Sequence, residues 1–292
     1  MNSPRSSRTW TFKATLHITS KSVPAKTITN LTGLQPDVEW VMGQTGLQSD
    51  PGSPARLSPR PSRFHLWEKY APAWHDKSLE EQVEGLLPFI RQAIGKLSTV
   101  QDELTIILRC GAMLRERHLS LTFSPPVVKD LALLGAEIGL DTYFDYFDEV
   151  VSTPRLLHSR EQVPEQVHAR LEVSSSTLGV DGIARLMGAA SDPSGPLEKV
   201  WVRSRGPSDD IFLSHHTHSV LQIFQEETCF VNEIVRQCHV RLVCVGRSRA
   251  ADPDVDTYRF GDGWEPDVVR ELARVNAALD IEVHFFDDAE SG

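Results

Sequence analysis

The sequence is poor in the residues that build disulfide frameworks, membrane spans and nucleic-acid-binding surfaces. It has four cysteines in 292 residues and no C-x-x-C pair. Three of them lie in apolar segments, so we expect buried free thiols in a reducing cytoplasm. No apolar run approaches the ~20 residues that span a bilayer, and the polar N-terminus predicts no signal peptide. The composition therefore argues against a membrane-spanning or secreted protein.

Positive charge is also scarce, and the shortage is uneven along the chain. The whole sequence carries 30 Lys and Arg against 40 Asp and Glu, a net charge of −10. Residues 1–150 hold 16 basic and 17 acidic side chains, whereas residues 151–292 hold 14 and 23. This balance argues against nonspecific binding to a phosphate backbone, which needs a basic face. The acidic second half favours a solvated surface or, alternatively, a face that meets a basic partner.

What the sequence does contain is a repeat. Phe12–Ile18 is similar to Val167–Val173, and Asp141–Phe144 is similar to Asp280–Val283. Between these anchors the element signals come in the same order, which indicates a duplicated domain. We therefore predict a disordered tail at 1–9, a first domain at 10–149, a linker at 150–165 and a diverged second copy at 166–289.

The spacing of apolar residues predicts an α+β fold of two tandem related domains. Each would be a mainly antiparallel sheet with packed helices, in the order β-α-β-β-α-β-β-α-β. In the first copy, 104–108 and 119–123 are expected to be strands, and the stretch between them is long enough for a hairpin. In the second copy we expect a strand at 210–214 and a helix at 218–238, with Trp201 equivalent to Trp40.

Several stretches of the first half together resemble a known family, the bacterial domain of unknown function 4279. The resemblance covers roughly residues 10–147, although Phe64 stands where family members tend to carry Trp. It implies no activity, cofactor or catalytic residue; related genes occur among toxin-immunity and phage-defence neighbours. The stretches that carry it are Thr11–Ile18, Leu34-Gln35-Pro36 before Trp40 and Gly43, Phe64-His65-Leu66, the helix from Leu79, and Leu133–Ala136 leading to Asp141–Phe144.

Motifs of catalysis are missing, which favours a non-catalytic protein without a cofactor over an enzyme. There is no G-x-S-x-G, P-loop or G-x-G-x-x-G sequence. The nearest approach to a metal site is His215, His216 and His218, although a polar corner explains these residues better. Asp252, Asp254 and Asp256 have calcium-loop spacing, but the rest of that pattern fails, so an acidic turn is expected.

The aromatic residues and the closing carboxylates give the candidate binding surface. Exposed aromatic side chains are frequent anchors of interfaces, and carboxylates at strand ends can hold ions or protons. We expect a protein-binding module, such as an immunity or defence-associated protein that neutralises a basic partner. The alternatives are a metal- or carboxylate-dependent hydrolase and a small-molecule sensor that binds between the copies. The candidate binding residues are Trp40, Trp67, Tyr70, Trp74, Trp201, Asp280 and Glu282.

Overall fold

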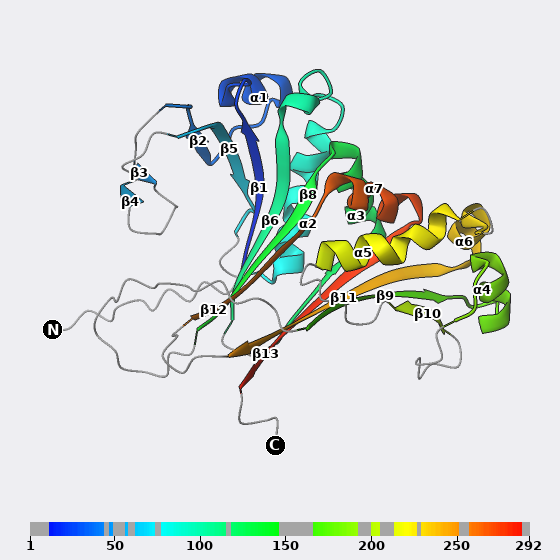
Figure 1. Ribbon diagram of the computed structural model, residues 1–292. Coiled ribbons are helices and arrows are strands. Elements are labelled where there is room, and N and C mark those ends of the chain that lie inside the picture. Colours follow the sequence, from blue (N-terminus) through cyan, green and yellow to red (C-terminus); the bar gives the residue numbers. More distant parts are fainter. Residues whose placement is uncertain are drawn as a thin grey trace.

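The structure is a computed structural model (Figure 1). The predicted tail (1–9) and linker (150–165) lie outside the residues that it describes. The described residues are 12–43, 47–48, 56–57, 62–73, 77–114, 118–145, 166–191, 200–204, 213–226, 229–250 and 257–287.

The first half follows the predicted element order, with one short extra strand pair between its second and third main strands. Its elements are β1 (Phe12–Ser20), α1 (Ala25–Thr32), β2 (Val38–Trp40), β3 (Leu47–Gln48), β4 (Arg56–Leu57), β5 (His65–Tyr70), α2 (Leu79–Ala93), η2 (Gln101–Glu103), β6 (Thr105–Leu114), β7 (His118–Phe123), α3 (Pro125–Leu134) and β8 (Glu137–Asp145).

The second half departs from its prediction in one region. Ser214 lies in a helix and not in the predicted strand 210–214, and the predicted helix 218–238 is three separate pieces. The elements are β9 (Gln166–Ser174), α4 (Val180–Met187), β10 (Val200–Ser204), α5 (Leu213–Leu221), η3 (Gln222–Gln225), α6 (Val231–Gln237), β11 (His239–Ala250), β12 (Thr257–Trp264), α7 (Pro266–Arg274) and β13 (Ala277–Asp287).

The two main sheets exchange one strand each. The six-stranded sheet, which we call sheet A, has the order β12-β8-β6-β1-β5-β2. The five-stranded sheet, which we call sheet C, has the order β10-β9-β11-β13-β7, and the short pair β3-β4 is sheet B. Thus β7 of the first half pairs with β13, and β12 of the second half pairs with β8. The hairpin that the sequence allowed between β6 and β7 does not form, because these consecutive strands lie in different sheets. The α+β class with mixed, mainly antiparallel sheets is confirmed.

The strand registers of the two main sheets correspond to each other. Leu108 pairs with Ile138 in sheet A, and Leu242 pairs with Leu279 in sheet C. The exchanged strands keep the same frame, since Ile138 pairs with Trp264 and Leu279 pairs with Phe123. Position 138 therefore corresponds to 279, which makes Glu282 the counterpart of Asp141. The sequence alignment of Asp141 with Asp280 was wrong by two residues, which is one full side-chain period of a strand.

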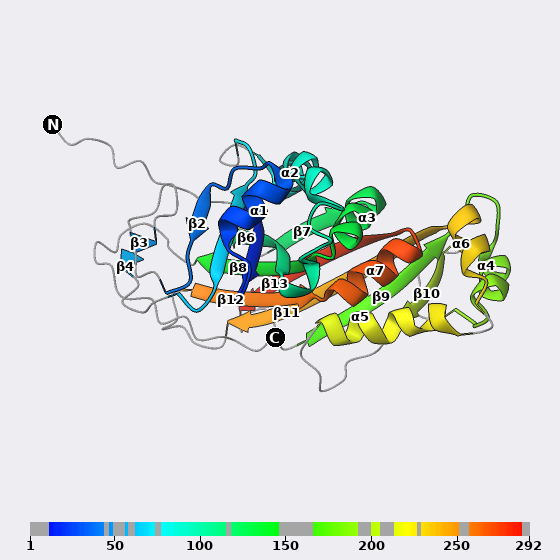
Figure 2. The same cartoon turned by 90° about the horizontal axis from the view of Figure 1, so that it is seen from above.

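Helices fill the angle between the two sheets, as both views show (Figures 1 and 2). Helix α2 packs on β1, α5 packs on β9 and β11, and α3 packs against α7 in the middle. Their buried apolar side chains join those of both sheets in one continuous hydrophobic cluster. The seam between the halves is therefore part of the core.

Local sequence signals explain the helix boundaries. At α2, Ser78 and Glu81 form a reciprocal capping box, and the helix runs on through Pro88. Helix α3 ends at Gly135, with φ of 69°, a conformation that suits glycine. Its repeat, α7, is followed by Asn276 with φ of 52°. Asparagine tolerates this left-handed conformation better than most residues, so the repeat keeps the turn without the glycine.

Candidate functional site

The face of sheet C that points away from the helices is lined with polar and charged side chains. In one row across the sheet, Arg170 lies opposite Val243, which lies opposite Asp280, which lies opposite Thr122. Because strand side chains alternate between faces, positions two residues away share this face. We call it the polar face of sheet C; its polar members are His118, Ser120, Thr122, His168, Arg170, Glu172, Arg241, Arg247, Asp280, Glu282 and His284.

One end of this face is an ion-pair network around Asp280, a predicted binding residue. Only 3% of Asp280 is exposed. Its carboxylate accepts hydrogen bonds from the Thr122 hydroxyl (2.5 Å) and from Arg241 Nε. Arg241 Nη1 also lies 3.6 Å from Glu172 Oε2, and Glu172 Oε1 lies 2.7 Å from Arg170 Nη2. The hydrogen bond to Asp280 is the main cause that raises the pKa of Arg241. The network thus joins four strands across the exchange boundary.

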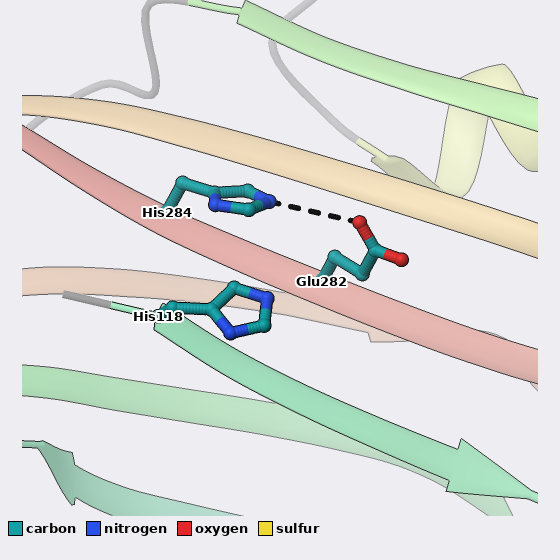
Figure 3. A group of neighbouring side chains, drawn as sticks. All are labelled: His118, Glu282 and His284. Carbon is teal, nitrogen blue, oxygen red and sulfur yellow. Dashed lines mark ion pairs between the residues drawn. The ribbon is translucent and has the colours of Figure 1, made fainter. Parts of the chain in front are cut away.

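At the other end, two histidines and a glutamate come together (Figure 3). His118 on β7 is the direct cross-strand partner of His284 on β13, with ring centroids 4.6 Å apart. Glu282 precedes His284 by two residues, so both point to the same face, and its Oε2 lies 3.6 Å from His284 Nε2. One ligand atom from each residue lies within 4.8 Å of the other two. Among the residues that the structure describes, these three side chains form the cluster of histidine, cysteine or carboxylate ligands that could hold a metal ion.

Burial and neighbouring charge favour neutral imidazoles at this end. The pKa of His284 is lowered by desolvation and then by the nearby His118, while Glu282 opposes the shift. The pKa of His168 is lowered by desolvation and then by Arg247 and Arg170. Neutral imidazole is the form that binds metals and accepts protons.

The predicted aromatic binding residues do not form one surface. Trp67 and Trp201 are completely buried, and their indole N–H groups donate to Thr29 Oγ1 (3.2 Å) and to the carbonyl of Ala189 (3.0 Å). Trp67 pairs with Ile18, and Trp201 pairs with Val173, the residue equivalent to Ile18. Trp201 is thus the repeat of Trp67, and its expected equivalence to Trp40 was wrong.

Tyr70, Trp74 and Trp40 differ in their surroundings. Tyr70 is 6% exposed; its hydroxyl donates to Glu68 Oε2 (3.3 Å), and Lys13 Nζ lies 4.2 Å from its ring centroid. Trp74 lies outside the described ranges. Trp40 is half-buried at the end of β2, where it pairs with Leu66 of β5. Of the aromatic candidates with described side chains, Trp40 is therefore the most accessible to a partner.

Beside Trp40 is a small exposed apolar surface that sequence reasoning missed. Val41, Met42 and Phe64 are 48%, 46% and 42% exposed. The chain here is held by a hydrogen bond from the Met42 amide to His65 Nδ1 (3.2 Å) and from the Gly43 amide to the Ser62 carbonyl (2.9 Å). We call Trp40, Val41, Met42 and Phe64 the β2 patch.

The predicted histidine cluster does not converge. His215, His216 and His218 all lie on α5, where His216 is buried and the other two are exposed. A helix turns by about 100° per residue, so residues 215 and 216 point in different directions. The calcium-like segment at 252–256 lies outside the described residues.

The cysteines are buried thiols, as predicted, except that Cys229 is half-buried. Desolvation is the largest cause of a raised pKa at each: to about 12 for Cys244, to about 11 for Cys229, and upward for Cys110 and Cys238. Thiols held in this protonated form are poor nucleophiles.

A comparison with protein families identifies the domain in the first half of the chain. Residues 9–145 match the family model described as "Domain of unknown function (DUF4279)". The first half is a DUF4279 domain. The DUF4279 domain ends with β8 and includes β7, the strand that it places in the sheet of the other half. No match was found among curated proteins or among solved structures.

Helix length gives one further fact about the chain. No helix among the described segments is long and apolar enough to cross a membrane.

Proposed function

We propose that the protein is a non-catalytic binding module and that the DUF4279 domain captures another protein through the β2 patch. The observation that carries this is the exposure of three large apolar side chains, Val41, Met42 and Phe64, beside Trp40. Contiguous apolar side chains at a surface are typical of interaction sites, and tryptophan is enriched among residues that dominate binding energy.

The position of the patch favours an extended segment of the partner. Strand β2 stands at the end of sheet A, next to β5. An added strand at a sheet edge gains main-chain hydrogen bonds, while alternate side chains enter apolar contacts. A segment laid along β2 would cover Met42 and Phe64.

The filled seam between the halves supports binding at the surface over a sensor or hydrolase with a central cleft. Helix α3 packs against α7 there, and one hydrophobic cluster runs through both halves. A ligand between the copies would have to displace this packing.

The net charge favours a partner with a basic surface, for example a toxin or nuclease. The described segments between 166 and 287 carry 11 acidic and 10 basic side chains, out of 23 and 14 in residues 151–292. The remaining 12 acidic and 4 basic residues therefore lie in the segments outside the described ranges. Such charge mainly raises the association rate and selects the partner, whereas the β2 patch supplies affinity.

The test combines identification with reciprocal binding. A photo-crosslinking amino acid at Val41 identifies the partner in cells of the source organism, and the purified partner is then titrated against the purified full chain. We expect Met42→Asp and Phe64→Asp each to weaken binding at least tenfold. The matched control is Leu133→Asp, because Leu133 is 56% exposed on α3, away from β2.

The proposal fails if Met42→Asp and Phe64→Asp bind the partner as wild type does, or if Leu133→Asp weakens binding equally. Turnover of a substrate by the purified chain would contradict the non-catalytic part. The unfolding temperature of each variant is measured as well. A value equal to that of the wild type shows that the variant has lost binding and has kept its fold.

A further inference from the structure

We propose that His118, Glu282 and His284 form a binding site for one Zn²⁺ ion on the polar face of sheet C. The site is independent of the β2 patch, which belongs to sheet A. Each residue offers a ligand that zinc uses in proteins, and two histidines with one glutamate are the protein ligands of a known class of zinc site.

The backbone brings the three ligands together. His118 and His284 are direct partners in the antiparallel pair of β7 with β13. Glu282 lies two residues before His284, and this spacing puts both side chains on one face. All three positions are thus set by strand register, which is more rigid than a loop.

The present separations are close to those that a bound ion needs. Ligand atoms about 2.1 Å from a tetrahedral ion lie roughly 3.4 Å from one another. Glu282 Oε2 and His284 Nε2 are already 3.6 Å apart, and no separation in the group exceeds 4.8 Å. Rotation of exposed side chains closes the difference, because His118 is exposed and the other two are half-buried.

The charges around the three side chains are compatible with a bound cation. Glu282 supplies a negative charge among the ligands themselves. An opposing positive charge comes from Arg247, the strand neighbour of His284. Arg247 is exposed, so solvent screens its repulsion of the ion. Three protein ligands leave one tetrahedral position for water or a ligand from outside.

Such an ion would join the two halves of the chain. His118 comes from the DUF4279 domain, and Glu282 and His284 come from the second half. A ligand that binds only the folded state stabilises it, so Zn²⁺ would hold the exchanged β7 strand in sheet C.

The test measures Zn²⁺ binding to the full chain after removal of metal with a chelator. We expect one Zn²⁺ per chain by calorimetry, and a rise of the unfolding temperature with Zn²⁺. His118→Gln, Glu282→Gln and His284→Gln should each weaken binding at least tenfold. The matched controls are His218→Gln on α5 and His239→Gln at the start of β11, both exposed histidines in the described chain.

Cobalt gives a second measurement that does not depend on affinity alone. Co²⁺ in this site should show visible absorption without a thiolate charge-transfer band, since the site has no cysteine. The proposal is overturned if the wild type takes up no Zn²⁺, if the three ligand variants bind as tightly as wild type, or if Co²⁺ shows thiolate coordination. Glu282→Gln keeps the side-chain shape, so it stays informative where a histidine variant folds poorly.

Discussion

Sheets A and C have corresponding strand registers, but the side chains on their outer faces differ. The registers of five strands agree between the sheets, including the exchanged strands, while β2 of sheet A has no counterpart in sheet C. On the inner side Trp67 and Trp201 are both fully buried at equivalent positions. On the outer side the buried Asp280 stands where sheet A has Gly139, and Arg241 stands where sheet A has Ile107. The packed sides of the two sheets therefore correspond, whereas their outer sides carry different side chains.

We expect the largest loss of stability from substitutions in β7 and β12, the two strands that lie in the sheet of the other half. Phe123 and Trp264 are equivalent, are 1% and 0% exposed, and each lies in the sheet of the other half. Replacing either by Ala should lower the free energy of unfolding by about 3–5 kcal/mol, through lost burial and a residual cavity. Trp264 also donates to Thr217 Oγ1 (3.1 Å), so Trp264→Ala should cost at least as much as Phe123→Ala.

Hydrogen exchange shows whether the two halves unfold together. We expect Phe123→Ala to lower amide protection in sheet C, and Trp264→Ala to lower it in sheet A, with one unfolding transition for the whole chain. If each substitution affected only the half that contains it in sequence, or if two transitions appeared, the exchange would not unite the halves. The exposed Leu133→Ala is the control and should change stability little.

The ion pairs of the two outer faces give the next largest difference. Arg241 pairs with Asp280, which is 3% exposed, whereas Arg109 lies 3.3 Å from Asp141 on the more exposed face of sheet A. Arg241→Ala leaves the buried carboxylate of Asp280 without its cation, and we expect a loss of about 1.5–3 kcal/mol, the range for a hydrogen bond to a charged group. Arg109→Ala should cost less than about 1 kcal/mol, as exposed pairs do.

Urea denaturation of both variants measures this difference directly. Asp280→Asn added to Arg241→Ala should recover part of the loss, because it removes the buried charge. Equal losses for the two arginine variants would mean that Asp280 is stabilised mainly by its neighbours other than Arg241.

Local patterns in the sequence predicted most elements, because helix caps and alternating strands depend on neighbouring residues. The residues that alternate between apolar and polar along 12–18 lie in β1, and Gly33, a residue type that commonly ends helices, ends α1. The partners of a strand do not follow from such patterns. The stretch between 108 and 119 was long enough for a hairpin, but β7 pairs with β13 of the second half.

The candidate metal site was missed for the same physical reason. Glu282 and His284 share a strand face by their spacing, which the sequence displays. His118 is 164 positions away from Glu282, and it reaches them only through the exchange. Trp67 and Trp201 were expected at a surface because aromatic residues serve both cores and interfaces, and composition alone does not distinguish these roles.

The smallest expected effect is a change in how stability depends on pH, and it also differs between the outer faces of sheets A and C. The pKa of His168 and of His284 is lowered in the folded state, first by desolvation in both cases. The folded state therefore binds fewer protons than the unfolded state just below the ordinary histidine pKa of about 6.5. Their contribution to stability is complete above that pH and is lost as pH falls toward the lowered values. The position equivalent to His168 in sheet A is Lys13, so this histidine contribution belongs to sheet C.

Chemical denaturation between pH 7.5 and pH 5.5 measures this contribution. We expect His168→Gln, and more so the double variant with His284→Gln, to lose less stability on acidification than wild type. The difference between variant and wild type is the quantity to compare, because Asp262 and Glu137 have raised pKa values, mainly from desolvation. Protonation of those two carboxyl groups changes stability in the opposite direction. An unchanged slope in the double variant would show that the acid sensitivity does not come from the polar face of sheet C.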